Sequence, residues 1–443
     1  MLKVAIIGGG AAGCFAAVNI KELNPDIDVT VYEAGSKLLA KVAVTGGGRC
    51  NLTNSFAQVR SLESVYPRGH RLMKRLLKEF SNADVCDWFE ARGVRLLTQP
   101  DQCVFPVSQD AMEIVNALLS GMRNAGVHIQ PRHKVLSVID MSTADGPRYK
   151  LSFAPDPDGT MPAGTEADIV LVTTGGSPKK SGLSMLDGLG LDIIDPLPSL
   201  FSFNIGDAAR PGENVRDAGL SALMGTVVEN AMAGIVGTKF RATGPLLITD
   251  WGMSGPAILK LSSYAARYLA DNQYNASLLV SWLGEAGQED ALSMLADMAK
   301  ANPQKQLSSI YPEAFNNRLW NFLLHWAGLS ETKRWAELGS KGMNRLAATL
   351  TGDIYPVVGR NRFKGEFVTC GGVSLSDIDP KTLECRSHSG LYFAGEVLDV
   401  DAITGGFNLQ AAWSTGFVAA RSIASRQSFQ TFRYSSSAHI SSR

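Results

Sequence analysis

The sequence predicts an α/β protein in which an open, largely parallel sheet is interrupted by a large insertion and completed by the C-terminus. Two observations support this fold class. Strands and helices alternate through the N-terminal third of the chain, which is typical of βαβ units. A pattern of short strands and glycines returns from Tyr355 onward, after a long stretch of different character. With 443 residues, the chain is long enough for two or three domains.

The individual elements follow from their local patterns. Apolar residues predict a strand at Lys3–Ile7, and small residues predict a helix at Ala11–Leu23. Alternating β-branched residues predict a second strand at Asp28–Glu33. Further helices are expected over 71–80, 84–91 and 111–124, and further strands over 134–140, 148–153 and 168–173. The chain is expected to end with a strand over 391–394 and a long helix over 408–425.

Changes in composition along the chain place the domain boundaries. Residues after Gly176 are β-like and punctuated by glycine and proline, and a mostly helical stretch follows. The predicted divisions are a sheet domain in two parts (1–195 and 355–426), a β-rich insertion (196–253, with part of 340–365), a helical domain (254–350) and a polar tail (427–443).

A glycine-rich turn between the first strand and the first helix is the strongest functional signal. Gly8, Gly10 and Gly13 have the G-x-G-x-x-G spacing of a dinucleotide-binding turn. Gly8 permits the tight turn, Gly10 lets a pyrophosphate approach the backbone, and Gly13 lets the helix pack on the strand. The N-terminus of the helix then presents free N–H groups and a positive dipole end to the phosphates. The sequence therefore predicts a Rossmann-type nucleotide site.

An acidic residue at the end of the second strand refines the choice of nucleotide. Glu33 lies about 20 residues after the glycines, where a carboxylate accepts hydrogen bonds from the ribose hydroxyls of adenosine. A carboxylate at this place also disfavours a 2′-phosphate. The pattern thus favours FAD or NAD over NADP.

Three later segments favour a flavin. A second glycine cluster at 46–48 is followed by Arg49 and Asn51, so backbone amides and a guanidinium approach a cofactor or an anionic substrate. A hydrophobic strand ends in Gly175-Gly176, where bare backbone can approach a ligand. In segment 390–416, the sequence predicts a strand, then an acidic residue, then glycines at the start of a helix. This arrangement predicts a second binding surface for the ribityl hydroxyls and the pyrimidine edge of a flavin. Completion of the first sheet's site by the C-terminus is typical of flavoproteins.

Together, these motifs resemble one family of bacterial flavoproteins. They are G-G-G-A-A-G (8–13), K-x-x-x-T-G-G-G-R-C-N-x-T-N (41–54), T-D-W-G-M-S-G-P-A-I-L (249–259), C-G-G-V (370–373) and G-L-Y-F-A-G-E-V-L-D-V-D (390–401). The combination is similar to the BaiN/RdsA-like family, also described as aminoacetone-oxidase-like or NAD(P)/FAD-dependent oxidoreductases. The resemblance spans nearly the whole chain, from Val4 to about Gly416.

The resemblance implies a split FAD-binding Rossmann domain, an inserted β-rich barrel-like domain and a small helical domain. It also implies cofactor contacts, carried over motif by motif. The predicted FAD-binding residues are Gly8, Gly10, Ala12, Gly13, Glu33, Lys41, Gly48, Arg49, Asn51, Val135, Gly175, Gly395, Glu396, Gly406, Asn408 and Leu409. Two positions depart from the family pattern. Ala402 stands where glycine is expected, and Asp250 stands where relatives often have histidine.

Composition narrows the expected partners and compartment. Forty-two basic residues balance 42 acidic ones, so a net charge of +0 gives no global attraction to nucleic acid or anionic membrane. Apolar runs fall far short of the ~20 residues that cross a bilayer, and no targeting segment is visible. The six cysteines form no C-x-x-C pair, and the histidines lack metal-ligand spacing. We therefore expect a cytoplasmic protein with reduced thiols, no metal and no membrane contact.

Candidate catalytic groups are few. Cys370 precedes Gly371-Gly372, so it is either a thiol acid beside the flavin or a small packing residue, and we favour packing. Arg49 suits two roles equally well. Its guanidinium either polarises a carbonyl and stabilises reduced flavin, or binds phosphate.

A group of basic residues lies on and before one predicted helix. These residues are Arg68, Arg71, Lys74, Arg75 and Lys78. Helical spacing gathers them on one face, which is either solvated or a binding surface for RNA phosphates. The RNA hypothesis follows from the resemblance, because part of that family is associated with reduction of a uridine in ribosomal RNA to dihydrouridine.

The leading functional hypothesis is an FAD-dependent reductase. NAD(P)H would reduce the flavin, and hydride would then pass to an activated C=C bond in a ribosomal RNA uridine or a small enone. Two alternatives remain open. One is an amine or aminoketone oxidase that uses O₂, and the other is a non-catalytic, RNA-associated flavoprotein.

Overall fold

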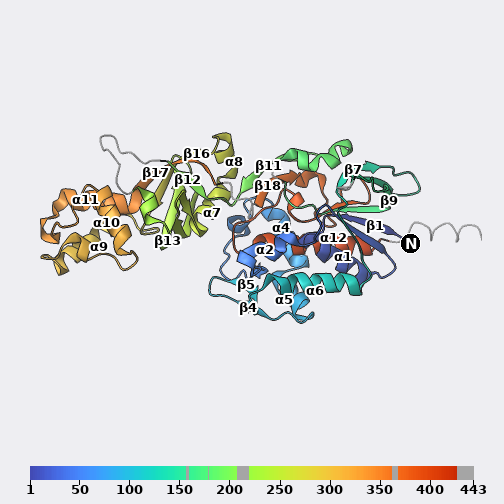
Figure 1. The fold of residues 1–443 in the computed structure, drawn as a ribbon, viewed down its shortest axis with the longest axis horizontal. Coiled ribbons are helices and arrows are strands. Elements are labelled where there is room, and N and C mark those ends of the chain that lie inside the picture. Colours follow the sequence, from blue (N-terminus) through green and yellow to red (C-terminus); the bar gives the residue numbers. More distant parts are fainter. Residues whose placement is uncertain (156–158, 178, 207–218, 362–367, 427–443) are drawn as a thin grey trace, which may run out of the picture. The chain divides into compact units, whose positions relative to one another are not determined.

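The computed structural model describes residues 1–155, 159–177, 179–206, 219–361 and 368–426. The chain divides into two compact units (Figure 1). The sheet unit comprises Met1–Leu197 and Val368–Arg443, and the barrel unit comprises Pro198–Phe367. Along the described residues, no helix combines the length and the apolar character that spanning a membrane requires.

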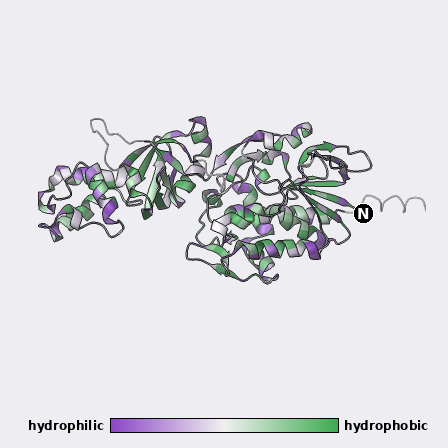
Figure 2. Cartoon of the chain, viewed as in Figure 1, coloured by the Kyte–Doolittle hydropathy of each residue, from purple (hydrophilic) through white to green (hydrophobic). Residues whose placement is uncertain are grey.

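A parallel sheet of five strands forms the centre of the sheet unit, in the order β19-β10-β1-β2-β6. Its strands are β1 (Lys3–Ile7), β2 (Asp28–Glu33), β6 (His128–Pro131), β10 (Ile169–Val172) and β19 (Leu391–Phe393). Every neighbouring pair is parallel. The apolar strands of this sheet are green in Figure 2, as expected for strands covered on both faces. Strand β19 comes from the C-terminal part of the chain, so the predicted completion of the sheet is confirmed.

Helices pack around this sheet. The described helices of the sheet unit are α1 (Ala11–Leu23), α2 (Ala40–Gly48), α3 (Leu62–Val65), α4 (His70–Glu79), α5 (Asn82–Glu90), α6 (Ala111–Asn124) and α12 (Phe407–Ala424). Small residues let α1 and α12 approach closely, since a Cβ on Gly416 would lie 2.9 Å from the Ala12 carbonyl oxygen. Phe15 of α1 packs on Phe80, Trp88 and Trp413, which ties α5 and α12 into the same core.

The remaining strands of the sheet unit do not join the parallel sheet. Strands β7 (Val135–Asp140), β8 (Tyr149–Phe153) and β9 (Thr165–Ala167) form an antiparallel sheet of their own. In β7, Leu136 and Ile139 are exposed, so this strand has a solvated face and cannot replace a fully buried parallel strand. The described part of this unit also contains two smaller sheets. One has the order β3 (Thr53–Asn54), β5 (Cys103–Pro106) and β4 (Leu96–Thr98). The other pairs β11 (Ile193–Ser199) with β18 (Val368–Val373).

A closed barrel forms the centre of the barrel unit, which confirms the barrel-like insertion. Its order is β12 (Phe203–Ile205), β15 (Gly252–Ser254), β14 (Arg241–Ile248), β13 (Val227–Ile235), β16 (Asn275–Ser281) and β17 (Asp353–Arg360). Neighbouring strands pair antiparallel. Because β17 closes the barrel, the chain returns to the sheet unit at Val368 rather than at residue 355.

The helices of the barrel unit share one hydrophobic core with the barrel. They are α7 (Pro256–Tyr264), α8 (Ala266–Asp271), α9 (Gln288–Ala301), α10 (Asn317–Trp326) and α11 (Gly339–Gly352). Trp282, Trp320 and Trp335 are buried in this core beside the barrel residues Phe203 and Val280. The helical stretch also contributes β16 to the barrel, so residues 254–350 do not have a core separate from it. The described residues also form 3₁₀ turns, at Lys180–Leu189, Leu220–Leu223, Leu307–Ser309, Trp335–Glu337, Leu375–Asp377 and Gly395–Val397.

Candidate functional site

The glycine turn between β1 and α1 has the geometry that its spacing predicts. Gly8 has a φ of +108°, and a Cβ on it would lie 2.5 Å from the Thr173 carbonyl oxygen. A Cβ on Gly13 would lie 2.1 Å from the Gly8 carbonyl oxygen, so only glycine lets α1 pack here. A Cβ on Gly10 would meet nothing within 4 Å. The turn is thus closed at two glycines and open at the third.

The start of α1 is suited to an anion. Gly10 precedes the helix and has no side chain to cap its amides, and the first turn carries no acidic residue. The unpaired N–H groups and the positive dipole end of the helix therefore face the open side of the turn.

Glu33 lies against the same turn. Its carboxylate accepts hydrogen bonds from the backbone N–H of Gly9 at 2.8 Å and of Gly35 at 2.6 Å. The parallel pairing of β1 and β2 brings their carboxyl ends together, which explains this position. The His133 N–H donates to the Glu33 carbonyl at 2.8 Å, so the start of β7, with buried Val135, follows close by in the chain.

The second glycine cluster is a sharp turn that interrupts α2. Gly46, Gly47 and Gly48 all have positive φ angles, of +58°, +67° and +83°. Cβ atoms on Gly47 and Gly48 would meet nothing within 4 Å, so this backbone is open to a ligand. Arg49 follows it, exposed, with its guanidinium carbon 4.7 Å from the centre of the Phe105 ring. The ring thus supports the guanidinium from one side.

The residues after Arg49 dock on the start of α12. A Cβ on Gly406 would lie 2.3 Å from the Thr53 carbonyl oxygen. With its amide oriented to satisfy both partners, Asn51 accepts from the Gly406 N–H at 3.2 Å and donates to the Thr53 carbonyl at 2.9 Å. The Asn54 amide donates to the Gly405 carbonyl at 3.1 Å, across 351 residues of sequence. The structure therefore brings two predicted motifs into contact.

A third contact between predicted cofactor segments involves Glu396, which lies close to Lys41 and Gly175. The Lys41 Nζ lies 4.0 Å from Glu396 Oε2, and the Thr369 N–H donates to Glu396 Oε1 at 2.9 Å. A Cβ on Gly175 would be 3.8 Å from Glu396 Oε2. A Cβ on Gly395 would lie 2.9 Å from the Ala12 Cβ, so the Glu396 loop lies directly against the start of α1.

The Asn408 side chain forms hydrogen bonds with the backbone of the segment that precedes α12. Its side chain accepts from the Ala402 N–H and donates to the Ala402 carbonyl, both at 2.9 Å. Ala402, the departure from the family pattern, is fully buried in this turn. Any cofactor contact at 408–409 would therefore come from the backbone of Asn408 or from Leu409, which is half-buried.

The structure corrects the prediction that Arg68 belongs to the exposed basic surface. Its place in the sequence groups it with the basic helix, but its side chain is only 14% exposed and makes a two-point ion pair with the fully buried Asp401. Burial alone would lower the pKa of Arg68, yet the hydrogen bonds and charge of Asp401 raise it above its ordinary value. The other four basic residues of the group, Arg71, Lys74, Arg75 and Lys78, are exposed on α4.

Cys370 and Cys50 are both fully buried. Burial raises the pKa of Cys50 to about 12, so its thiol stays protonated at ordinary pH. Burial of Cys370 in β18 supports the interpretation of this residue as a packing group.

Several contacts of the site have no local sequence signal. Thr173 donates from its hydroxyl to the Gly8 carbonyl at 2.8 Å, and Thr369 anchors Glu396. Neither threonine belongs to a motif with a fixed spacing. Asp401 ends the 390–401 motif, but nothing in that motif indicates that it pairs with Arg68. Only the paired strands and docked loops reveal them.

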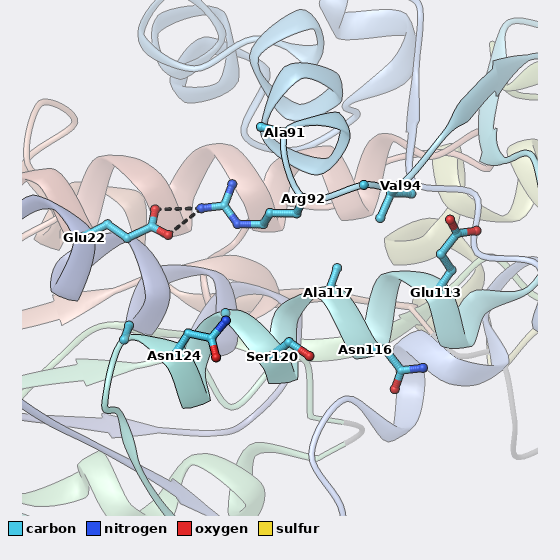
Figure 3. Close-up of a pocket in the computed structure, with 12 residues that line it drawn as sticks. Glu22, Ala91, Arg92, Val94, Glu113, Asn116, Ala117, Ser120 and Asn124 are labelled. Atoms are coloured by element: carbon cyan, nitrogen blue, oxygen red, sulfur yellow. Dashed lines mark hydrogen bonds and ion pairs between the residues drawn. The ribbon is translucent and has the colours of Figure 1, made fainter.

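A pocket of about 860 Å³ lies elsewhere on the sheet unit, between α6 and the turn that follows α5. Figure 3 shows Glu22 and Arg92 paired at one side, with Asn116, Ser120 and Asn124 along α6. None of its lining residues is a predicted cofactor contact, so we treat it as separate from the site.

Comparison with known proteins places this fold and site in a family. The model of the HI0933-like protein Rossmann domain matches residues 2–422. A 3-dehydro-bile acid delta(4,6)-reductase from Clostridium scindens is 27% identical over 96% of this chain and 100% of its own length. Ribosomal RNA dihydrouridine synthases from Haemophilus influenzae (28% identical, over 95% of this chain and 98% of the relative) and Escherichia coli (27%, over 96% and 98%) are similarly related. The chain therefore belongs to the family of HI0933-like proteins with a Rossmann domain.

Proposed function

We propose that this protein is an FAD-dependent oxidoreductase. The observation that carries the proposal is the convergence of the glycine turn with the C-terminal loop, where a Cβ on Gly395 would lie 2.9 Å from the Ala12 Cβ. A mononucleotide would need the turn alone. A dinucleotide whose second half carries a redox ring needs a further cradle beside the turn, and the 395–409 loop provides one.

The residues present fit this cofactor. The open side of Gly10 and the uncapped start of α1 suit the pyrophosphate, and the Glu33 carboxylate suits the ribose of adenosine. The open backbone at Gly47 and Gly48 and the contacts among Lys41, Gly175 and Glu396 lie on segments that would hold the flavin half. When bound, FAD supplies a two-electron carrier. The chain's own residues bind and orient it and exclude water.

The substrate proposed is a C=C bond that accepts hydride. The related proteins are named as ribosomal RNA dihydrouridine synthases and a bile acid delta(4,6)-reductase, and both names describe C=C reduction. We favour a uridine of ribosomal RNA, with a small enone as the second candidate. In the overall reaction NAD(P)H gives up a hydride and becomes NAD(P)⁺. The C5=C6 bond of uridine gains that hydride and one proton from water. An rRNA substrate would place the protein in the cytoplasm.

The α4 basic face, defined as Arg71, Lys74, Arg75 and Lys78, supports RNA over the enone. All four side chains are exposed, while Leu72, Met73 and Leu76 on the other side of α4 are buried. Within the described part of the chain, none of the four forms an ion pair. On a chain with a net charge of +0, such a local group of uncompensated cations suits a phosphate backbone.

Reconstituted protein tests the proposal directly. Oxidised holoenzyme is mixed anaerobically with NADH or NADPH, followed by unmodified ribosomal RNA transcript or a steroid enone. Bleaching of the flavin and formation of dihydrouridine, detected by mass spectrometry of the digested RNA, are expected. Enone reduction without RNA reduction would select the second candidate. Reduction of the flavin by an amine alone, with rapid reoxidation by O₂, would replace the proposal with an oxidase, and failure to bind FAD would reject it.

A further inference from the structure

The segment before α4 is tied to the turn before α12 by several independent contacts. We call residues 399–409 the cofactor turn. The Ile403 N–H donates to the Val65 carbonyl at 3.0 Å, and the Tyr66 hydroxyl donates to the Phe407 carbonyl at 2.9 Å. Next in the chain, a Cβ on Gly69 would lie 2.5 Å from Cγ2 of Val400. Residues 65–69 therefore follow the cofactor turn along its length.

The Arg68–Asp401 pair is the charged contact in this group. Arg68 donates through Nε and Nη2 to the two oxygens of Asp401, and the backbones of the two residues also form a β-bridge. Asp401 is fully buried and Arg68 nearly so. A buried two-point pair holds its partners in one geometry, and loss of one partner leaves a charge without compensation.

The residues on either side of Asp401 in the chain contact residues of the candidate site. Ala402, the next residue, is held on both its N–H and its carbonyl by Asn408. Between them lies Gly406, whose backbone contacts Thr53 and Asn51. On the other side of Asp401, the Asp399 carboxylate accepts from the Gly371 N–H at 2.9 Å. A shift at Asp401 would therefore move the backbone that faces the predicted flavin half.

We propose that Arg68 is a positioning residue, which holds the cofactor turn through Asp401 in the conformation that receives the flavin half of FAD. The inference rests on the proposed FAD binding and adds a residue outside every cofactor motif. It also separates Arg68 from the α4 basic face, which begins three residues later at Arg71. Arg68 acts on the cofactor turn, and the face is proposed to act on the nucleic acid.

Two conservative variants test the pair. Arg68→Lys keeps the charge but loses the planar two-point geometry, and Asp401→Asn keeps the shape but loses the charge. Each is purified as apoprotein, and its FAD affinity is measured by quenching of flavin fluorescence. The visible absorption spectrum of the reloaded protein and the melting temperature of the apoprotein are recorded as well. We expect FAD affinity to fall about tenfold or more, with an altered flavin spectrum, because a charge-assisted buried pair is lost.

A second ion pair in the same unit provides the control. The side chains of Arg426 and Glu384 are 21% and 19% exposed, so this pair is less buried than Arg68 and Asp401, at 14% and 0%. Within the described residues, the Arg426 side chain contacts Glu384, Ser389 and the Tyr392 ring, none of which lies in the cofactor turn. Arg426→Lys is expected to lower the melting temperature while leaving FAD affinity and the flavin spectrum unchanged. The proposal is overturned if Arg68→Lys and Asp401→Asn bind FAD with the affinity of the wild type. It is also overturned if they lower FAD affinity only as much as Arg426→Lys does. If the wild-type protein itself binds no FAD, the proposed function fails as well, which distinguishes the two failures.

Discussion

The carboxylate of Glu33 accepts a hydrogen bond from the Gly9 backbone amide at 2.8 Å. The end of β2 thereby contacts the glycine turn that follows β1, and this contact defines the nucleotide end of the site. Substitution of Glu33 by Gln removes the negative charge while keeping nearly the same shape. We expect FAD affinity to fall by about tenfold to a hundredfold, as for loss of a hydrogen bond to a charged group worth about 1.5–3 kcal/mol.

The control for this variant is Glu22→Gln. Glu22, on α1, pairs with Arg92, which lies in the turn after α5, outside the candidate site. Titration of both apoproteins with FAD compares the two directly. Equal affinity of Glu33→Gln and wild type would show that this carboxylate does not bind the cofactor.

Gly10 and Gly13 are expected to respond differently to the same substitution. Gly10→Ala adds a Cβ into open space at a φ of −85°, so the fold should keep its melting temperature while the approach of a pyrophosphate is blocked. Gly13→Ala puts a Cβ 2.1 Å from the Gly8 carbonyl oxygen, so the protein itself should lose stability. Differential scanning calorimetry and FAD titration separate the two effects. A large loss of stability in Gly10→Ala would contradict the assignment of its open side to the ligand.

Local patterns were sufficient to predict the parallel sheet and its glycine turn. A short, β-branched apolar run such as Ile169–Val172 favours a buried strand, and the glycines after β1 predict the tight turn into α1. The order of the strands was not readable in the same way. Strand β16 lies among helices, and β17 begins at Asp353, so the closing of the barrel depends on pairings between distant segments. For the same reason the predicted strands β7 and β8 could not be assigned partners from the sequence, and the structure pairs β7 with β8 and β8 with β9.

The residues of the candidate site also differ in whether the sequence alone could reveal them. Residues that act through their own backbone or charge at a fixed spacing, such as Gly10 and Glu33, carry a signal in the sequence. Arg68 carries none, because its role depends on Asp401, 333 residues further along the chain. Its neighbours in sequence are basic, so composition placed it on the wrong surface. Burial, which sequence spacing does not determine, separates it from them.

The thiols are expected to differ in reactivity. Cys86 is half-exposed, with its pKa raised to about 11 by burial and by nearby Glu90 and Asp87. The other five cysteines are buried. Because the thiolate is the reactive form, modification of the native protein by iodoacetamide should occur first at Cys86 and accelerate as the pH rises toward 11.

Mass spectrometry of the labelled peptides checks this order, with Cys86→Ser as the control that should abolish native labelling. All six thiols should react in denaturant. Rapid labelling of Cys370 in the native state would instead support its interpretation as an accessible thiol acid.

Asp353 is expected to stabilise the barrel unit. Its buried carboxylate accepts hydrogen bonds from the indoles of Trp282 at 3.2 Å and Trp326 at 2.6 Å, and from the Tyr355 hydroxyl at 2.5 Å. Asp353→Ala would leave these donors without their acceptor, at a cost of about 3 kcal/mol or more in the free energy of unfolding. Urea unfolding followed by tryptophan fluorescence measures the change. Asp297→Ala, at an exposed position on α9, is the control and should change stability little.

The α4 basic face should account for a defined part of the salt dependence of RNA binding. Replacement of all four residues by Gln removes four charges without altering the buried side of the helix. If each contacts one phosphate of a single strand, the slope of log affinity against log salt should become shallower by about 3, since each contact contributes about 0.7. Filter binding of a ribosomal RNA transcript at several salt concentrations gives both slopes.

The matched control for this face removes the same number of exposed charges from the barrel unit. It replaces Lys239, Lys300, Lys305 and Lys341 by Gln. Both quadruple variants carry the same net charge, so a general electrostatic attraction would lower their slopes equally. A selective loss in the α4 variant would assign the phosphate contacts to that helix, because only the local arrangement of charge differs. Equal slopes in the two variants would leave the α4 basic face as a solvated helix surface, and the substrate would then be sought among small enones.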